Sequence, residues 1–306
     1  MKTIASLSAR VLLWTIVTLF QIQLVSAQAD STRNNTHSGG KLSLNYLSNS
    51  VYYGRKDSLT LPYITAGARY DAKGGFYISG SLAYLAAANE HRIDLVSVDA
   101  GYSFDISNKL NGEVYGEKNW YNSSSANVKS DIKGSIGGQL SYDASVVQIN
   151  GGSDIRFASK TDIGFTLGVS RGFYSGNDDG RFSAEPAITA NWSTLHSYEG
   201  YIDRKFRRKN QPAGGTATAV TTVQNNKMTL LDYELSIPLT YETKSWGIAF
   251  TPYYSIAQHP ITTTTVLTTR QNNGQVNTVT VNSTPASELN LANTFYAELE
   301  FYLRIH

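Results

Sequence analysis

Between residues 96 and 105 the chain reads Val96-Ser97-Val98-Asp99-Ala100-Gly101-Tyr102-Ser103-Phe104-Asp105, with apolar and polar side chains in alternation. Successive side chains of a β-strand point to opposite faces, so this segment predicts a strand with one apolar and one polar face. The same alternation, broken by turns, continues from Ile93 to His306. The sequence shows no amphipathic helix that would cover the apolar faces, so these faces need another apolar partner.

Lipid is the economical partner for such strands. A closed sheet satisfies its backbone hydrogen bonds inside a membrane, with lipid on the outside and water or ion pairs on the inside. We therefore predict an all-β fold, a transmembrane antiparallel up-and-down β-barrel of roughly 12 to 14 strands. The candidate strands span residues 42–53, 61–72, 75–86, 93–106, 110–121, 131–142, 146–157, 162–173, 182–192, 198–206, 229–241, 246–257 and 291–305.

Two features conflict with this list of strands. Its count is odd, whereas single-chain bacterial barrels close with an even number, and the stretch 131–157 gives the weakest pattern. Pro186, Pro238 and Pro252 lie inside candidate strands, and a closed barrel has no edge strand on which a missing N–H is harmless. We expect bulges or interfacial positions to accommodate these prolines.

Composition agrees with a barrel and excludes other classes. The chain has 306 residues, no cysteine and a net charge of +2, so it has no disulfide framework and no thiol metal site, and the balance argues against a nucleic-acid binder. The mean hydropathy of −0.27 is too polar for a helical membrane protein. A soluble β-sandwich would share this average, and only the pattern separates the two.

The N-terminus predicts export. Lys2 and Arg10 form a positive region, residues 11–20 an apolar run, and Val25-Ser26-Ala27 a small-residue cleavage signature. We therefore expect a signal peptide at 1–27, the alternative being an anchor helix. A flexible periplasmic lead-in should follow at 28–41, and the barrel itself should occupy 42–306.

Connection lengths predict an orientation. Residues 71–74, 107–109 and 242–244 are tight turns, whereas 207–228 and 258–290 are long polar stretches. In bacterial barrels short turns face the periplasm and long loops face outward. Within the second long loop, two Thr/Val-rich stretches meet across Asn272-Asn273-Gly274, which predicts a hairpin.

Three tryptophans outside the signal sequence sit at the ends of candidate strands, in phase with the apolar face. They are Trp120, Trp192 and Trp246. An aromatic girdle at the hydrocarbon boundaries needs such residues, because the ring is buried while its N–H stays hydrated. The alternative is that these are ordinary core tryptophans of a sandwich.

The last segment carries a resemblance to a known class. One face holds Phe295, Ala297, Leu299, Phe301, Leu303 and Ile305, and the other holds Tyr296, Glu298, Glu300, Tyr302 and Arg304. This resembles the terminal strand of Gram-negative outer-membrane β-barrel proteins, although the usual final aromatic is replaced by Ile305-His306. The resemblance implies location in the outer membrane, contact with its lipid and lipopolysaccharide, and recognition by the barrel-assembly machinery. It implies no activity and no oligomeric state.

The inward face is the expected place for function. Its candidate lining residues are Asp99, Asp105, Glu113, Glu117, Glu185, Glu199, Asp232, Glu234, Glu298, Glu300 and Arg304. Carboxylates in such a lumen bias a pore toward cations. Pairs such as Asp232/Glu234 also suit a two-carboxylate hydrolase, but a polar lining is what every barrel interior needs.

The run Arg204-Lys205-Phe206-Arg207-Arg208 suggests a lipopolysaccharide contact. If residues 198–206 form a strand, Arg204, Phe206 and Arg208 point to lipid where that strand enters an outer loop. Guanidinium groups bind phosphate bidentately, and the alternative is a solvated charge cluster.

No histidine occupies a mid-strand position suited to a catalytic base. We therefore expect no catalytic residues, no cofactor and no metal site. A small porin-like channel is the first functional hypothesis. A structural or adhesive surface protein presenting Thr-rich outer loops is the second, and a barrel enzyme is the third.

Overall fold

The computed structural model describes residues 38–56, 60–177, 179–224, 226–259, 261–283 and 293–305. The predicted signal peptide (1–27) and most of the predicted lead-in (28–41) lie outside these ranges. The first strand already begins at Gly39 and ends at Leu47, so it starts and ends earlier than the sequence indicates. Within the described ranges, no helix has both the length and the apolar character needed to cross a membrane.

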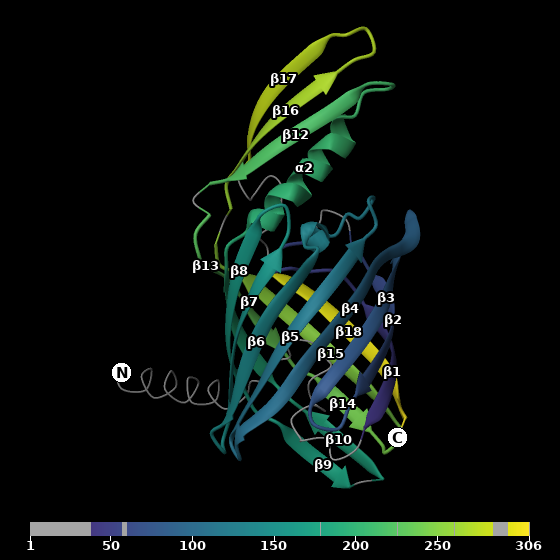
Figure 1. The fold of residues 1–306 in the computed structure, drawn as a ribbon, viewed down its shortest axis with the longest axis vertical. Coiled ribbons are helices and arrows are strands. Elements are labelled where there is room, and N and C mark those ends of the chain that lie inside the picture. The colour runs from purple at the N-terminus through teal and green to yellow at the C-terminus, as the bar shows by residue number, and fades with distance from the viewer. Residues whose placement is uncertain are drawn as a thin grey trace, which may run out of the picture.

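Twelve strands close into an antiparallel barrel (Figure 1). Closure joins β1 to β18 and β13 to β15, and all pairings around the ring are antiparallel. The ring consists of β1 (Gly39–Leu47), β2 (Tyr63–Asp71), β3 (Phe76–Ala87), β4 (Glu90–Ser107), β5 (Leu110–Tyr121), β6 (Gly134–Asp143), β7 (Gln148–Phe157), β8 (Thr161–Ser170), β11 (Ala187–Ser193), β13 (Thr229–Ser236), β15 (Trp246–Ala257) and β18 (Thr294–Ile305).

Exposure along these strands is the reverse of that in a soluble protein. On β8 the outward side chains are apolar, and Ile163 and Leu167 are 49% and 44% exposed. The intervening inward side chains are polar, and Asp162 and Ser170 are completely buried. Soluble proteins bury apolar residues and expose polar ones, so this outward face requires an apolar surrounding medium.

Prolines divide two of the predicted strands. Pro186 separates β10 (Gly180–Ala184) from β11, and Pro238 separates β13 from β14 (Leu239–Glu242). Pro252 stays inside β15, and its carbonyl accepts a hydrogen bond from the N–H of Ile237 at 3.2 Å. The nitrogen and the carbonyl of a strand residue face the same neighbour, so the missing N–H of Pro252 faces the break between β13 and β14. All three prolines therefore lie at or beside interruptions of the ladder, where no N–H is needed.

The predicted strand over 198–206 is wrong. Residues His196–Asn210 form helix α2, with Tyr198, Tyr201 and Ile202 buried on one face. Residues three and four positions apart lie on the same face of a helix, which fits this spacing. The strand prediction considers only alternate residues and so does not group Tyr201 with Tyr198 and Ile202. Without this segment, the list of candidate strands contains twelve members, as the barrel does. The stretch 131–157, which gave the weakest pattern, contains the barrel strands β6 and β7.

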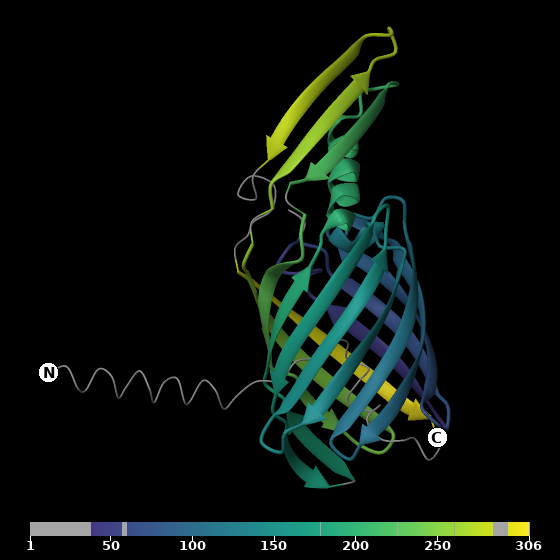
Figure 2. The same cartoon turned by 60° about the vertical axis from the view of Figure 1, so that its left-hand side comes forward.

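The two long connections are in part a second sheet, and we call the end of the barrel that carries them the outer end and the opposite end the inner end. Strands β12 (Thr216–Val223), β16 (Thr263–Arg270) and β17 (Val276–Ser283) form it, and α2 packs against β12. The hairpin across Asn272-Asn273-Gly274 is present, with Gly274 at φ +84°. We call α2 and these three strands the outer module, which projects beyond one end of the barrel (Figures 1 and 2).

The opposite end of the barrel carries short connections and both ends of the described chain. Gly40 lies beside Ile305 there, and Gly74 and Gly75 make a tight turn with positive φ values. A Cβ on Gly75 would lie 2.1 Å from Ser103 O, so only glycine fits this position. The hairpin of β9 (Phe173–Asn177) and β10 extends below this end.

Candidate functional site

A group of carboxylates lines the inward faces of β4, β5, β13 and β18. We call Asp99, Glu113, Glu117, Glu234 and Glu298 the carboxylate belt. Each accepts a hydrogen bond from a neutral hydroxyl, the donors being Ser79, Tyr77 (2.9 Å), Ser135 (3.2 Å), Tyr296 and Tyr253 (3.2 Å) respectively. A neutral donor orients a carboxylate and brings no positive charge of its own beside it.

Nearer the inner end of the lumen, carboxylates are joined to basic side chains. Lys41 lies 3.0 Å from Glu300, Arg69 lies 2.8 Å from Asp71, and Arg304 lies 2.6 Å from Glu242. These ion pairs balance much of the charge at that end.

The connection after β1 folds across the lumen near its outer end. We call residues 48–56 the plug loop. Its Tyr52 hydroxyl receives a hydrogen bond from Arg156 on β7. Between β7 and β2 stand β6, β5, β4 and β3, and between β7 and β1 stand β8, β11, β13, β15 and β18. Tyr52 therefore reaches the wall opposite its own strands.

Arg55 fixes the plug loop at a second point. Its guanidinium is almost completely buried and donates to Tyr53 O and, at 2.6 Å, to His259 O beyond β15. Burial lowers the pKa of Arg55 to about 10. Carbonyl acceptors offset part of this desolvation, so the loop is held by a buried, hydrogen-bonded cation.

A short 3-10 helix, η1 (Val128–Asp131), enters the mouth from the connection between β5 and β6. Its Lys129 places Nζ 5.8 Å from the centroid of the Tyr52 ring, and Arg156 Cζ lies 5.7 Å from the same centroid. Burial lowers the pKa of Lys129, while Glu117 and Glu234 act in the opposite direction. Two cations thus lie near the ring of one tyrosine, and we call this part of the lumen, crossed by the plug loop, the outer constriction.

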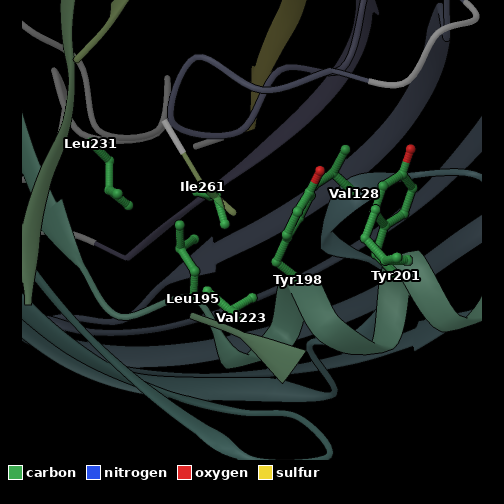
Figure 3. Close-up of a cluster of buried hydrophobic side chains, with 8 residues drawn as sticks. Val128, Leu195, Tyr198, Tyr201, Val223, Leu231 and Ile261 are labelled. Atoms are coloured by element: carbon green, nitrogen blue, oxygen red, sulfur yellow. The ribbon is translucent and has the colours of Figure 1, made fainter. Parts of the chain in front are cut away.

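Apolar residues from three sides of the ring meet above this constriction. Figure 3 shows Tyr198 and Tyr201 rising from α2 toward Val128, with Leu231 and Ile261 across from them. The buried cluster consists of Val128, Leu195, Tyr198, Tyr201, Ile202, Val223, Leu231 and Ile261, with Tyr52, Tyr53 and Phe206 packed against it. The outer mouth is therefore narrowed by a packed apolar layer as well as by the plug loop.

Buried polar contacts anchor α2 to the barrel rim. Asp162, completely buried at the outer end of β8, accepts from the backbone N–H groups of His196 (2.6 Å) and Ser197 (2.7 Å). A carboxylate at a helix N-terminus also interacts favourably with the helix dipole. Lys160 on the rim pairs with Glu199 of the first turn at 2.7 Å.

The structure corrects the basis of the predicted lipopolysaccharide contact. Arg204, Phe206 and Arg208 lie on α2, not on a strand facing lipid. Arg204 pairs with Asp131 at 3.0 Å, and Arg208 donates to backbone carbonyls at residues 123 and 125. These arginines hold the helix to the loop after β5.

Most predicted lining residues lie on inward strand faces, and three do not. Glu199 is on α2, Glu185 occupies the break between β10 and β11, and Asp105 is exposed at the inner end of β4. The inward-facing members are Asp99, Glu113, Glu117, Asp232, Glu234, Glu298, Glu300 and Arg304. Asp232 is buried beside the belt and accepts from Ser255 and, at 2.9 Å, from Asn191.

The three tryptophans lie at strand ends on the outward face. Trp120 is 52% exposed near the outer end of β5. Near the outer end of β11, the ring centroid of Trp192 lies 5.6 Å from that of Phe165. Trp246 begins β15 at the inner end, 6.2 Å from Phe301. They occupy both ends of the outward apolar surface.

Sequence reasoning missed most of the basic residues in the lumen. Lys41, Arg69 and Arg156 follow the same alternation as the predicted carboxylates and were detectable from it. Lys129 lies in an irregular segment, where no periodicity indicates which way a side chain points. Tyr52 falls within the candidate strand 42–53, but the strand ends at Leu47. Among the residues whose placement is described, no group of three or more histidine, aspartate or glutamate side chains is arranged to hold a metal.

The reversed exposure pattern decides the class. The chain is a transmembrane β-barrel. No protein-family model matches it, and no curated protein matches its sequence. Among solved structures, it is similar to "KdgM porin" (10% identity, 88% of this chain and 99% of that chain covered, TM-score 0.41). It is also similar to "Salmonella typhi OmpF complex with Daunomycin" (9% identity, 88% and 97% covered, TM-score 0.30).

A third neighbour is the "outer membrane channel DcaP of Acinetobacter baumannii" (8% identity, 90% and 99% covered, TM-score 0.31). All three superpose only loosely on this chain. The assignment stands on strand closure, the outward apolar surface and the inward polar surface of the molecule itself.

Proposed function

We propose that this barrel is a small ion channel of the outer membrane that prefers cations. The observation that carries the proposal is the carboxylate belt on the inner wall of a closed barrel. Rings of carboxylates lower the energy of cations in a pore and raise that of anions. The ion pairs at the inner end add little to this preference, because each cancels its own charge.

The outer mouth limits how much current such a pore carries. The plug loop crosses the lumen, and the apolar cluster packs above it. A barrel of intermediate strand number already leaves only a narrow lumen once side chains fill it. We therefore expect small conductance steps rather than the large ones of an open porin.

The test is conductance of the refolded protein in planar bilayers, with the reversal potential measured across a KCl gradient. We expect discrete current steps. We also expect a reversal potential whose sign shows that K⁺ permeates more readily than Cl⁻. Replacing two belt residues, Glu117→Gln with Glu298→Gln, should lower the K⁺/Cl⁻ permeability ratio. Glu90→Gln is the matched control, because Glu90 pairs with Arg92 at the outer rim.

Folding of each variant is measured independently of its conductance. A shift in gel mobility on heating reports the closed barrel, and only protein that shows it enters the bilayer experiment. Folded barrels that insert without any current steps would refute the channel.

A second candidate is a surface role for the outer module. Strand β17 is exposed along nearly its whole length and, among the strands that the structure describes, pairs with β16 alone. Residues 271–283 include no charged residue. Uncharged edge strands are templates for pairing with another chain. Loss of cell-surface attachment on deletion of residues 263–283, with the barrel still folded, would favour this role.

We also propose that the barrel-assembly machinery recognises β18 during folding.

A further inference from the structure

Two fixed cations, Arg156 and Lys129, lie at the outer constriction, near the same Tyr52 ring. Arg156 binds Asp154, Ser193 and Tyr52, so its charge serves the structure. Within the described parts of the chain, no ion pair joins Lys129 to a carboxylate, and its closest aromatic partner is the Tyr52 ring at 5.8 Å.

We propose that Lys129 is a specificity-determining residue of the channel: its ammonium group is a tethered cation at the constriction that opposes the carboxylate belt. This inference rests on the channel function proposed above. Permeating cations meet Lys129 before or after the belt according to their direction of travel.

The placement of Lys129 supports this role. Asn127 accepts from the backbone N–H of Lys129 at 2.9 Å and caps η1, so the start of the side chain is fixed. Its Nζ lies 5.8 Å from the ring centroid of Tyr52, in the loop that crosses the lumen. The carboxylates of Glu117, Glu234 and Glu298 favour the charged form of Lys129 and oppose the effect of burial on its pKa. These carboxylates come from β5, β13 and β18, which stand at separate positions around the ring.

Two consequences follow from electrostatics. A positive charge several ångströms from the ion path lowers the local cation concentration, so removing it should raise the K⁺/Cl⁻ permeability ratio by roughly two- to three-fold at low salt. Charges of opposite sign placed in series along a pore also make the current depend on the direction of the voltage. Both effects weaken as salt shortens the screening length from about 10 Å at 0.1 M to about 3 Å at 1 M.

The experiment compares Lys129→Gln with Lys209→Gln in bilayers at 0.1 M and 1 M KCl. Lys209 is exposed on the outer module and is the matched control. We expect Lys129→Gln to raise the permeability ratio two- to three-fold and to reduce the current asymmetry at low salt, with little change at high salt. Lys129→Arg should retain the wild-type values.

A merely structural Lys129 would alter heat-modified gel mobility or channel noise, without the salt-dependent change in selectivity. Glu117→Gln provides a second variant, because removing a belt charge should shift the reversal potential in the opposite direction. Conducting channels in which Lys129→Gln and Lys209→Gln behave alike overturn the inference and leave the channel standing. Folded wild-type protein without current overturns both.

Discussion

A single arginine on the lipid-facing surface tests the orientation of the whole barrel. Leu299 is 43% exposed on the outward face of β18, and four residues separate it from Phe295 toward the outer end and from Leu303 toward the inner end. At about 3.3 Å per residue and a tilt of about 40°, four residues span roughly 10 Å of depth. Leu299 therefore lies near the middle of an apolar band of about 25 Å.

Leu299→Arg should lower the free energy of unfolding by about 2–4 kcal/mol, because the guanidinium must lie in hydrocarbon. Phe295→Arg is the control on the same face and strand. Phe295 is 65% exposed at the outer end, where the cost of arginine falls to about 0–1 kcal/mol.

The assay is urea unfolding of each variant in lipid vesicles, followed by tryptophan fluorescence, with gel mobility as a second measure of folding. Equal costs for the two substitutions, or a cost below about 1 kcal/mol for Leu299→Arg, would show that this face does not meet the membrane interior.

Two further predictions concern the outer mouth. Asp162→Asn removes the carboxylate at the N-terminus of α2, which should weaken the attachment of the helix to the barrel by about 1 kcal/mol and speed trypsin cleavage after Arg207 about five-fold. Asp179→Asn, at an exposed position, is the control. Equal cleavage rates in the two variants would contradict the role of Asp162 as an anchor. Tyr52→Phe removes the hydroxyl that meets Arg156, at a cost of up to about 1.5 kcal/mol, so open states of the plug loop should become roughly ten-fold more frequent in single-channel records. Tyr70→Phe on the outward face should leave the record unchanged, and unaltered opening in Tyr52→Phe would mean that this hydrogen bond does not hold the plug.

The barrel strands were predictable because each one carries its own signal. Segments such as 110–121 and 246–257 match the observed strands to the residue, since alternation depends only on the two-residue period of a strand. The error at 198–206 arose because Tyr198, Gly200 and Ile202 alternate while Tyr198, Tyr201 and Ile202 also follow a helical period. In the structure, Asp162 on β8 accepts hydrogen bonds from the backbone N–H groups at the N-terminus of α2. The local sequence of the helix does not indicate this partner.

The carboxylates of the lumen were detectable for the same reason as the strands, but their environment was not. Alternation places Glu234 and Glu298 on the inward face, yet it does not show that tyrosine hydroxyls orient them. It likewise assigns no direction to loop side chains, so Lys129 was absent from the expected site. The plug loop was missed because the pattern extended the first strand to residue 53, whereas the strand ends at Leu47.

The amino-acid order by itself determined that this chain forms a membrane barrel, because period-two amphipathicity is a local property that every strand repeats. Tertiary structure alone decided that the mouth is narrowed, since Tyr52 and Arg156 are 104 residues apart in sequence and meet only because the ring closes. Ring closure brings opposite walls within reach of one loop, and no local pattern encodes which loop folds inward.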